Sequence, residues 1–518
     1  MTAAKNDIRK PLVALLGISF VARLFAAAFV EFGNDEVYYW TYALYPALSH
    51  FDHPPMVGWM IQFFSLNLLF DSELAIRLSS VVFMTIDTYI IYLIGKEAKD
   101  ELTGLYAALL YTGSVYAFII TGVFIMPDTP LSLFWLLATL LATRWLRSDT
   151  PSAWHILLTG LLIGLAFLSK YTGMFIWVGI GLYTLIFDRK KLRDPWLYVA
   201  ILISIACTIP VVYWNWQNDF ISFGFHSERV SLFSKPNMAY FGTELGGELL
   251  YNNPVNFVLA VVAVVAFFKG RLQGDACTQR LIVCTALPLI AVFWFFALTR
   301  PTLPHWNSPA FNLLIVLSAM MLRGKNDRKD IPRPIVASLS LIALVLVLGI
   351  VEIKTGIVPL DRHTEAEKLG RDDFTLDMYG WHKFGEEFGK LREKSVNEGA
   401  IDEDCGIIAH KWFPLANLDY YVARPLGMKA FGLGQINDIH KYHWINELRG
   451  SLQPGSDYWY ITDSHYYNEP NAMYDAYFED ITLIDTITID RCGKPAKNFF
   501  VYKCTDLKKL PANELDER

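Results

Sequence analysis

The chain has 518 residues, of which 53% are hydrophobic and only 19% are charged, and its mean hydropathy is +0.30. This composition is too apolar for a soluble globular protein and indicates an integral membrane protein. The net charge is -6, and the basic residues fall in segments where membrane topology already accounts for them, so the sequence predicts no nucleic-acid partner. No Gly-rich phosphate loop and no dinucleotide fingerprint is present.

Apolar stretches of membrane-spanning length recur along the first two thirds of the chain. A bilayer core of about 30 Å needs about 20 apolar residues per helix. The eleven expected spans are residues 11–30, 74–95, 102–121, 127–146, 153–169, 171–187, 196–214, 252–269, 279–298, 305–322 and 332–353. With the N-terminus in the cytoplasm, nineteen Lys and Arg residues fall in inside segments and five in or near outside segments, as the positive-inside rule requires.

The residues after the last expected span differ in character. Charge density rises, and apolar runs shorten to strand length at 405–409, 457–462, 482–488 and 499–502. A helix is expected over 378–397, and residues 493–496 are expected to form a turn between the last two strands. We therefore expect a transmembrane domain at 1–353 with an external loop at 31–73, followed by an extracytoplasmic mixed α/β domain at 354–518.

The six cysteines are not spaced as metal ligands. Cys207, Cys277 and Cys284 fall in or beside expected spans, where a small apolar packing role is the simplest interpretation. The other three, Cys405, Cys492 and Cys504, lie in the external domain. An oxidising compartment would permit one disulfide among them and leave one thiol over, and the sequence leaves the pairing open.

The first external loop is rich in titratable groups. Residues 33–40 contain Asp35, Glu36 and Tyr39, and residues 49–55 contain Asp52 and His53. Charged groups beside lipid must find a partner or water as the chain folds, so this density favours a reaction or a charged ligand. A merely solvated interfacial loop is the alternative.

The remaining polar signals lie on the same expected side. Asp128 stands between two prolines at the mouth of a span, where it could instead serve only as a helix cap. Lys170 lies in a tight turn and could simply extend to the lipid headgroups. Further cations are contributed by His226, Arg229, Arg300 and His305. Cations beside carboxylates suit a phosphate held next to a carboxylate base.

Five motifs in this order resemble a known family. They are residues 35–40, 51–56, 127–130, 168–171 and 304–306. They are similar to the bacterial dolichyl-phosphate-mannose protein mannosyltransferases and their aminoarabinose and galacturonic acid transferase relatives, over roughly residues 10–330. The resemblance implies the GT-C fold, a mainly α multi-span helical bundle, and a polyprenyl-phosphate-linked sugar as donor.

Carried over by position, the resemblance implies that Asp35 is the catalytic carboxylate, with Glu36 beside it and Tyr39 lining the site. Asp128 would be the second acidic residue. The aminoarabinose transferases have Glu-Lys where this chain has Asp52-His53, and in those enzymes the Lys is taken to contact the carrier phosphate. In this chain His53, whose charge depends on pH, would make that contact. The same transferases have Arg where this chain has Tyr38. Both departures suggest a different sugar or acceptor.

The mechanism that the family implies agrees with these residue types. Lys170, Arg229, Arg300 or a protonated His53 would stabilise the leaving phosphate while Asp35 takes the proton of the acceptor hydroxyl. Asp52 and His226 could bind a divalent ion, although no cofactor is required by the sequence.

We therefore expect a glycosyltransferase of the bacterial inner membrane, with its site and C-terminal domain on the periplasmic side. The acceptor would be lipid A, another glycolipid or a protein. A transporter or flippase of a lipid-linked sugar is the alternative, although the charges gather at the outer mouth rather than at the bilayer midplane, and no internal repeat of spans is evident. A scaffold that binds a partner through its external domain has no positive support.

Overall fold

The computed structural model describes residues 8–149, 152–229, 235–325 and 330–510. The chain divides into two compact units. The helical unit comprises the described residues up to Ala28 together with Pro46–Leu346, and the mixed unit comprises Phe29–Tyr45 together with the described residues from Val347 onward. The short segment 29–45 therefore packs with residues that follow it by more than three hundred positions.

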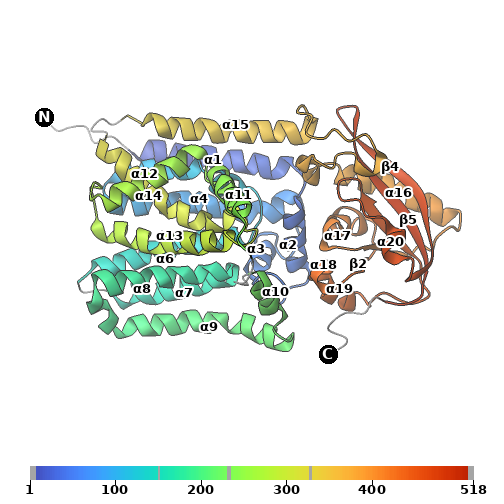
Figure 1. Ribbon diagram of the computed structural model, residues 1–518, viewed down its shortest axis with the longest axis horizontal. Helices are drawn as coiled ribbons and strands as arrows, with labels where there is room; N and C mark the ends of the chain where they lie inside the picture. Colours follow the sequence, from blue (N-terminus) through green and yellow to red (C-terminus); the bar gives the residue numbers. More distant parts are fainter. Residues whose placement is uncertain (1–7, 150–151, 230–234, 326–329, 511–518) are drawn as a thin grey trace. The chain divides into compact units, whose positions relative to one another are not determined.

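The long helices of the helical unit run side by side in Figure 1. Their bounds are α1 Arg9–Phe29, α4 Glu73–Ala98, α5 Glu101–Thr112, α6 Asp128–Arg147, α7 Ala153–Ser169, α8 Phe175–Phe187, α9 Pro195–Gln217, α12 Pro254–Phe268, α13 Ala276–Ala297, α14 Ser308–Lys325 and α15 Arg333–Thr355. Shorter elements connect them: α3 Met56–Phe64, the π-helix η1 Tyr116–Ile120, η2 Tyr171–Met174, η3 Arg189–Arg193, α10 Ile221–Arg229, α11 Met238–Tyr251 and η4 Pro304–Asn307.

Each of the eleven expected spans overlaps one of these long helices, and the ends differ by a few residues except over 102–121, where α5 ends at Thr112 and the π-helix η1 follows. Among the described residues, six helices are long and apolar enough to cross a membrane alone. A seventh span arises if α11 and α12, which meet at a bend of 105°, are taken together. The expected loop at 31–73 is not extended, because it contains α2 Asn34–Leu44 and α3.

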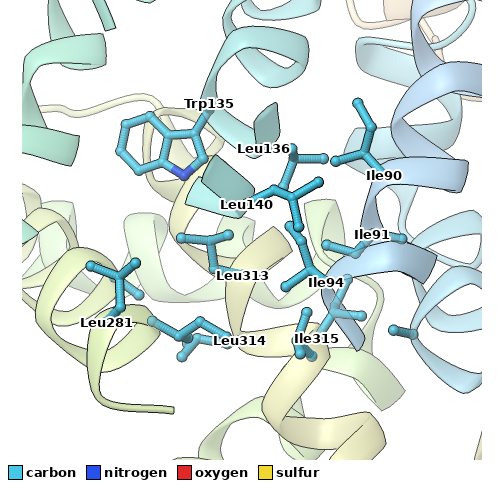
Figure 2. Close-up of a cluster of buried hydrophobic side chains, with 14 of the residues drawn as sticks. Ile90, Ile91, Ile94, Trp135, Leu136, Leu140, Leu281, Leu313, Leu314 and Ile315 are labelled. Carbon is cyan, nitrogen blue, oxygen red and sulfur yellow. The ribbon is translucent and has the colours of Figure 1, made fainter. Parts of the chain in front are cut away.

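The helical unit is held together by interlocking apolar side chains. Figure 2 shows Ile90, Ile91 and Ile94 of α4 beside side chains of α6, α13 and α14. Small residues allow the closest approaches between helices. A Cβ on Gly160 of α7 would lie 2.3 Å from the Ala200 carbonyl oxygen of α9, so only glycine permits this contact.

Polar caps set several helix ends on the expected cytoplasmic side. The Asp100 carboxylate accepts the Thr103 N–H at 2.7 Å and begins α5, while Asp275 does the same for α13 through Thr278, also at 2.7 Å. Arg147 donates to Asp275 at 3.1 Å, which ties α6 to the start of α13. The basic residues of this side thus serve as structural partners as well as topological signals.

The mixed unit combines a five-stranded sheet with helices. Its elements are α2, the short 3-10 helices η5 Ala366–Lys368 and η6 Phe374–Met378, α16 Trp381–Asn397, β1 Gly406–Ala409, α17 Trp412–Leu418, the π-helix η7 Asp419–Ala423, β2 Ala430–Gly432, α18 Ile436–Ile439, α19 Tyr442–Leu448, β3 Tyr458–Asp463, α20 Pro470–Tyr474, β4 Phe478–Arg491 and β5 Lys494–Leu507. The four expected strands overlap β1, β3, β4 and β5, and the expected helix overlaps α16. The three-residue strand β2 is too short for a sequence pattern to reveal.

The strand order is β2-β1-β3-β5-β4. β1 pairs in parallel with β2 and β3, whereas β3, β5 and β4 are antiparallel neighbours. The last two strands form a long hairpin, visible at the edge of the sheet in Figure 1. α16 covers one face of the sheet, where Phe384 stacks on Phe499 with ring centroids 3.8 Å apart and Phe388 meets Trp459.

All six cysteines are free thiols. Cys405 and Cys504 are buried, and Cys492 is exposed in the turn between β4 and β5. The disulfide that an oxidising compartment would permit is therefore absent from the described structure.

Candidate active site

A buried ion pair lies at the start of α6. Both oxygens of the Asp128 carboxylate accept from Lys170 Nζ, at 3.0 and 2.8 Å, and the Tyr116 hydroxyl donates to the first oxygen at 3.0 Å. Asp128 is 1% exposed and Lys170 is 7% exposed. Lys170 ends α7, so its side chain is fixed at the carboxylate and does not extend to the surface. Burial of both charges is tolerated because each satisfies the other.

The loop 49–55 lies close to this pair. His53 is near enough to Asp52, Lys170, His226 and Asp128 for their charges to act on it. Burial is the largest effect and lowers the pKa of His53 to about 4, below its usual value of 6.5. His53 is therefore neutral at physiological pH. Above that pKa it is a neutral hydrogen-bonding group rather than a cation.

His226 is positioned by α10. Its Nε2 lies 2.9 Å from the backbone carbonyl oxygen of Asp52, and its ring meets the Tyr171 ring edge-on with centroids 5.1 Å apart. A carbonyl only accepts, so His226 donates the proton of Nε2 to it. This contact holds the 49–55 loop against α10.

The third side of the cluster is η4. Trp306 places its ring 6.0 Å from Lys170 Nζ, within reach of a cation–π interaction. His305 lies near enough to Lys170 and Asp128 to interact with both charges, and its ring centroid is 5.9 Å from that of Tyr251. Five separate segments thus bring Asp52, His53, Asp128, Lys170, His226 and His305 together in the helical unit.

Two other predicted cations are less well defined. Arg300 follows α13, is half-buried, and its backbone N–H donates to Phe296 O at 3.1 Å. Arg229 is the last residue of α10, and its side chain lies outside the described residues. Neither is shown to join the Asp128–Lys170 cluster.

Asp35, Glu36 and Tyr39 belong to α2 in the mixed unit. Asp35 is exposed in the first turn of the helix. Glu36 is buried, and its Oε2 accepts the Gly33 N–H at 3.0 Å, so this carboxylate provides a hydrogen-bond acceptor for a backbone N–H at the start of α2. Tyr39 is buried against Tyr38 and Tyr42. The start of α2 is also held by Asn417, whose Nδ2 donates to Asn34 Oδ1 at 2.8 Å.

Sequence reasoning missed a buried carboxyl pair on α11. Asn307 donates from Nδ2 to both Glu244 and Glu248, Trp294 Nε1 donates to both oxygens of Glu248 at 3.0 Å, and Thr302 donates to Glu244 at 2.7 Å. Both glutamates are fully buried. The sequence did carry a signal for this pair, because Glu244 and Glu248 are four residues apart and lie on the same face of a helix. Like charges at that spacing repel unless they share partners or a proton.

The proposed metal ligands do not form a complete site. His226 uses Nε2 for the Asp52 backbone carbonyl, and among the described residues these two belong to no group of three potential ligands. In the described part of the chain, the one group of three potential ligands is Asp361, His363 and Asp372, in the mixed unit. The Asp361 carboxylate already accepts from the backbone N–H groups of Gly370 and Asp372.

Residues 52–214, which include the Asp128–Lys170 pair, match the family model described as dolichyl-phosphate-mannose-protein mannosyltransferase. The chain is 22% identical over 303 residues to the lipid A galacturonosyltransferase RgtD of Rhizobium johnstonii. That alignment covers 56% of this chain and 61% of RgtD, so the chain spans about three fifths of the curated relative.

Solved structures give the fold. ArnT from Cupriavidus metallidurans in the apo state is 12% identical, with a TM-score of 0.59 over 95% of this chain and 98% of ArnT. The same protein bound to undecaprenyl phosphate gives 12% identity and a TM-score of 0.61 over 96% and 98%. The resemblance to the GT-C glycosyltransferases is confirmed. The alignment extends through the mixed unit, which the motifs alone had not covered.

Proposed function

We propose that this protein is an integral membrane glycosyltransferase that moves a sugar from a polyprenyl-phosphate donor to an extracytoplasmic acceptor. The chain would cross the bacterial inner membrane eleven times, with the Asp128–Lys170 cluster and the mixed unit on the periplasmic side. Lipid A is the acceptor that the similarity to RgtD favours, ahead of another glycolipid or a protein. The likeness to ArnT bound to undecaprenyl phosphate supports a polyprenyl phosphate as the carrier.

The observation that carries the proposal is the buried Asp128–Lys170 pair. A membrane protein that needed only stability would gain little by burying two charges, because their desolvation offsets most of their attraction. Here the pair lies beside the 49–55 loop and η4, inside the segment that matches the family model. A preorganised cation in a dry site stabilises negative charge that develops during a reaction.

The leaving phosphate would be bound by Lys170. An ammonium has three N–H donors, and two of them reach Asp128, so one remains for a phosphate oxygen. His53 would add a neutral N–H donor, and Arg300 would add charge. As the bond between the anomeric carbon and the phosphate oxygen breaks, its electron pair stays on the phosphate, where Lys170 stabilises it.

The attacking group would be activated by Asp35. The acceptor hydroxyl forms the new bond to the anomeric carbon from the face opposite the phosphate, and its proton passes to the Asp35 carboxylate. A single displacement of this kind inverts the anomeric configuration. Glu36 would fix the start of α2, which sets the direction of Asp35, and Tyr39 would line the site.

No step of the proposed transfer uses a metal ion. Asp52 and His226 provide two ligands at most, whereas metal sites usually recruit three or more protein ligands. Removal of divalent ions by a chelator is therefore expected to leave transfer unchanged, and this is measured in the same assay.

The decisive experiment compares lipids and glycans by mass spectrometry in cells lacking the gene and in cells complemented with wild type, Asp128→Asn or Asp35→Asn. A sugar that is missing from one species in the deletion and restored only by wild type would identify the donor residue and the acceptor together. Asp219→Asn is the matched control, because Asp219 is an exposed carboxylate that follows α9. Full restoration by Asp128→Asn and Asp35→Asn would contradict the proposal.

A further inference from the structure

A cavity of about 430 Å³ lies in the mixed unit at the carboxyl ends of two parallel strands. Residues that follow β1, including His410, Lys411 and Phe413, form one wall. Residues 464–468, which follow β3, form a second, and residues of 367–372 form the third. Open sheets with parallel strands bind ligands at this edge, because the loops that leave neighbouring strands diverge there.

The lining combines two kinds of group. Arg371, Lys368 and Lys411 contribute positive charge and Glu367 and Asp372 negative charge, and Lys368 is paired with Glu365 at 3.4 Å. Phe413, Tyr466 and Tyr467 contribute aromatic surface. Aromatic faces pack against the C–H faces of sugar rings, and guanidinium and ammonium groups bind phosphate or carboxylate substituents. The chemistry fits a saccharide that carries an anionic group.

Several of these groups lack a protein partner. Neither ring nitrogen of His410 has a hydrogen-bond partner in the described part of the chain, although both are shielded from solvent. A buried polar group without a partner costs free energy, which a ligand hydroxyl could offset after rotation of the ring. Within the same described residues, the side chains of Arg371 and Lys411 form no ion pair or hydrogen bond.

Residues in and next to the cavity lining contact α2, inside the same unit. Trp412, next to the lining residue Phe413, packs its ring 4.9 Å from that of Tyr38. Tyr466 stacks edge-on against Phe413 and lies within hydrogen-bonding reach of Asn34, the residue before Asp35. The Tyr466 side chain thus lies between the cavity and the segment that carries the proposed base.

We propose that this cavity binds the anionic saccharide head of the acceptor and directs its hydroxyl toward Asp35. The assignment rests on the proposed transferase function, because it names the acceptor site of that reaction. It makes Arg371, Lys411 and His410 binding residues, remote from the bond that is broken.

Binding can be tested without turnover. The full chain in lipid nanodiscs is titrated with N-acetylglucosamine 1-phosphate, N-acetylglucosamine and inorganic phosphate, with isothermal calorimetry or saturation-transfer NMR as the readout. The sugar phosphate should bind more tightly than either fragment, and Arg371→Gln/Lys411→Gln should weaken it about tenfold or more, the effect of losing charge-assisted hydrogen bonds. Lys394→Gln, an exposed lysine of α16 that does not line the cavity, is the matched control.

Each alternative outcome is decisive. If inorganic phosphate binds as tightly as the sugar phosphate, the saccharide assignment is wrong. If the neutral sugar binds as tightly as the sugar phosphate, the requirement for an anionic group is wrong. If the double variant binds the sugar phosphate as tightly as wild type, the ligand binds elsewhere. In a transfer assay, the double variant should raise the KM for acceptor about tenfold and leave kcat and the KM for donor unchanged. If wild type transfers sugar but this KM does not move, the cavity assignment fails alone. If no transfer occurs while the sugar phosphate still binds as predicted, the proposed function fails and the binding site stands.

Discussion

The two units hold their charged groups in opposite ways. In the helical unit, Asp128 and Lys170 are buried and form an ion pair with each other. In the mixed unit, Arg371 and Lys411 are exposed at a cavity. A charge in a low-dielectric bundle needs a fixed partner, whereas one in contact with water does not. The first arrangement is suited to preorganised catalysis and the second to binding a ligand that supplies its own charge.

The largest effect should come from breaking the buried pair. Asp128→Asn leaves Lys170 as an uncompensated buried charge, which costs about 3–5 kcal/mol of stability, and it should also abolish transfer. Thermal unfolding in detergent and the transfer assay measure the two losses. The double variant Asp128→Asn/Lys170→Met should regain stability without regaining activity; a double variant that is active would show that the pair is only structural.

Asp35 offers the contrasting case of an exposed carboxylate. Asp35→Asn should reduce transfer by about two to four orders of magnitude, the usual effect of losing a general base, and should change the melting temperature little because the side chain is exposed. Wild-type turnover by the variant would remove the assigned role. An acceptor that is itself an ionised phosphate would give a smaller loss, because it needs no base.

The carboxyl pair on α11 extends the comparison to a buried site where, among the described residues, no Lys or Arg pairs with the carboxylates. Glu248→Ala should destabilise the protein by about 1–3 kcal/mol, because it leaves the Trp294 N–H without an acceptor and removes one of the two acceptors of Asn307. Glu248→Gln keeps an oxygen acceptor and should cost clearly less. Melting temperatures of the two variants against wild type check this, and equal losses would show that the charge itself is required.

The smallest effect concerns His53, whose pKa burial lowers to about 4. Between about pH 4 and pH 6.5 the unfolded chain binds this proton and the folded chain does not, so stability falls as the pH falls through this window. Because neutral His53 would bind the phosphate through an N–H, His53→Gln should keep donor affinity within about threefold at about pH 5.5 and pH 8.

The opposite result has a clear meaning for the same residue. A tenfold or greater loss for His53→Gln at about pH 5.5 alone would mean that bound phosphate raises the pKa of His53 enough to protonate it. Donor affinity of both proteins at the two pH values separates these cases. His53→Lys, which is charged throughout, provides the reference for a permanent cation.

Much of the architecture follows from local sequence. The positions of all eleven long helices and of β1, β3, β4 and β5 were predicted, because hydrophobic length and strand-like apolar runs are properties of neighbouring residues. The external loops also revealed Asp128, Lys170, His53 and His226 as candidates, since ionisable residues beside apolar spans are conspicuous.

Tertiary structure decided how those candidates combine. Helix register and chain topology, which no local pattern encodes, decide three features. They are the hydrogen bond from Tyr116 to Asp128, the ion pair between Lys170 and Asp128 across forty-two residues, and the packing of segment 29–45 with the C-terminal residues. The sequence presented Glu244 and Glu248 as two acidic residues on an apolar helix, and only packing against Trp294 and Asn307 made them one buried site. By itself the sequence determined which segments are helices and which residues can carry charge. Which charges are buried and paired was decided by the fold, because the cost of burial depends on partners that are distant in the chain.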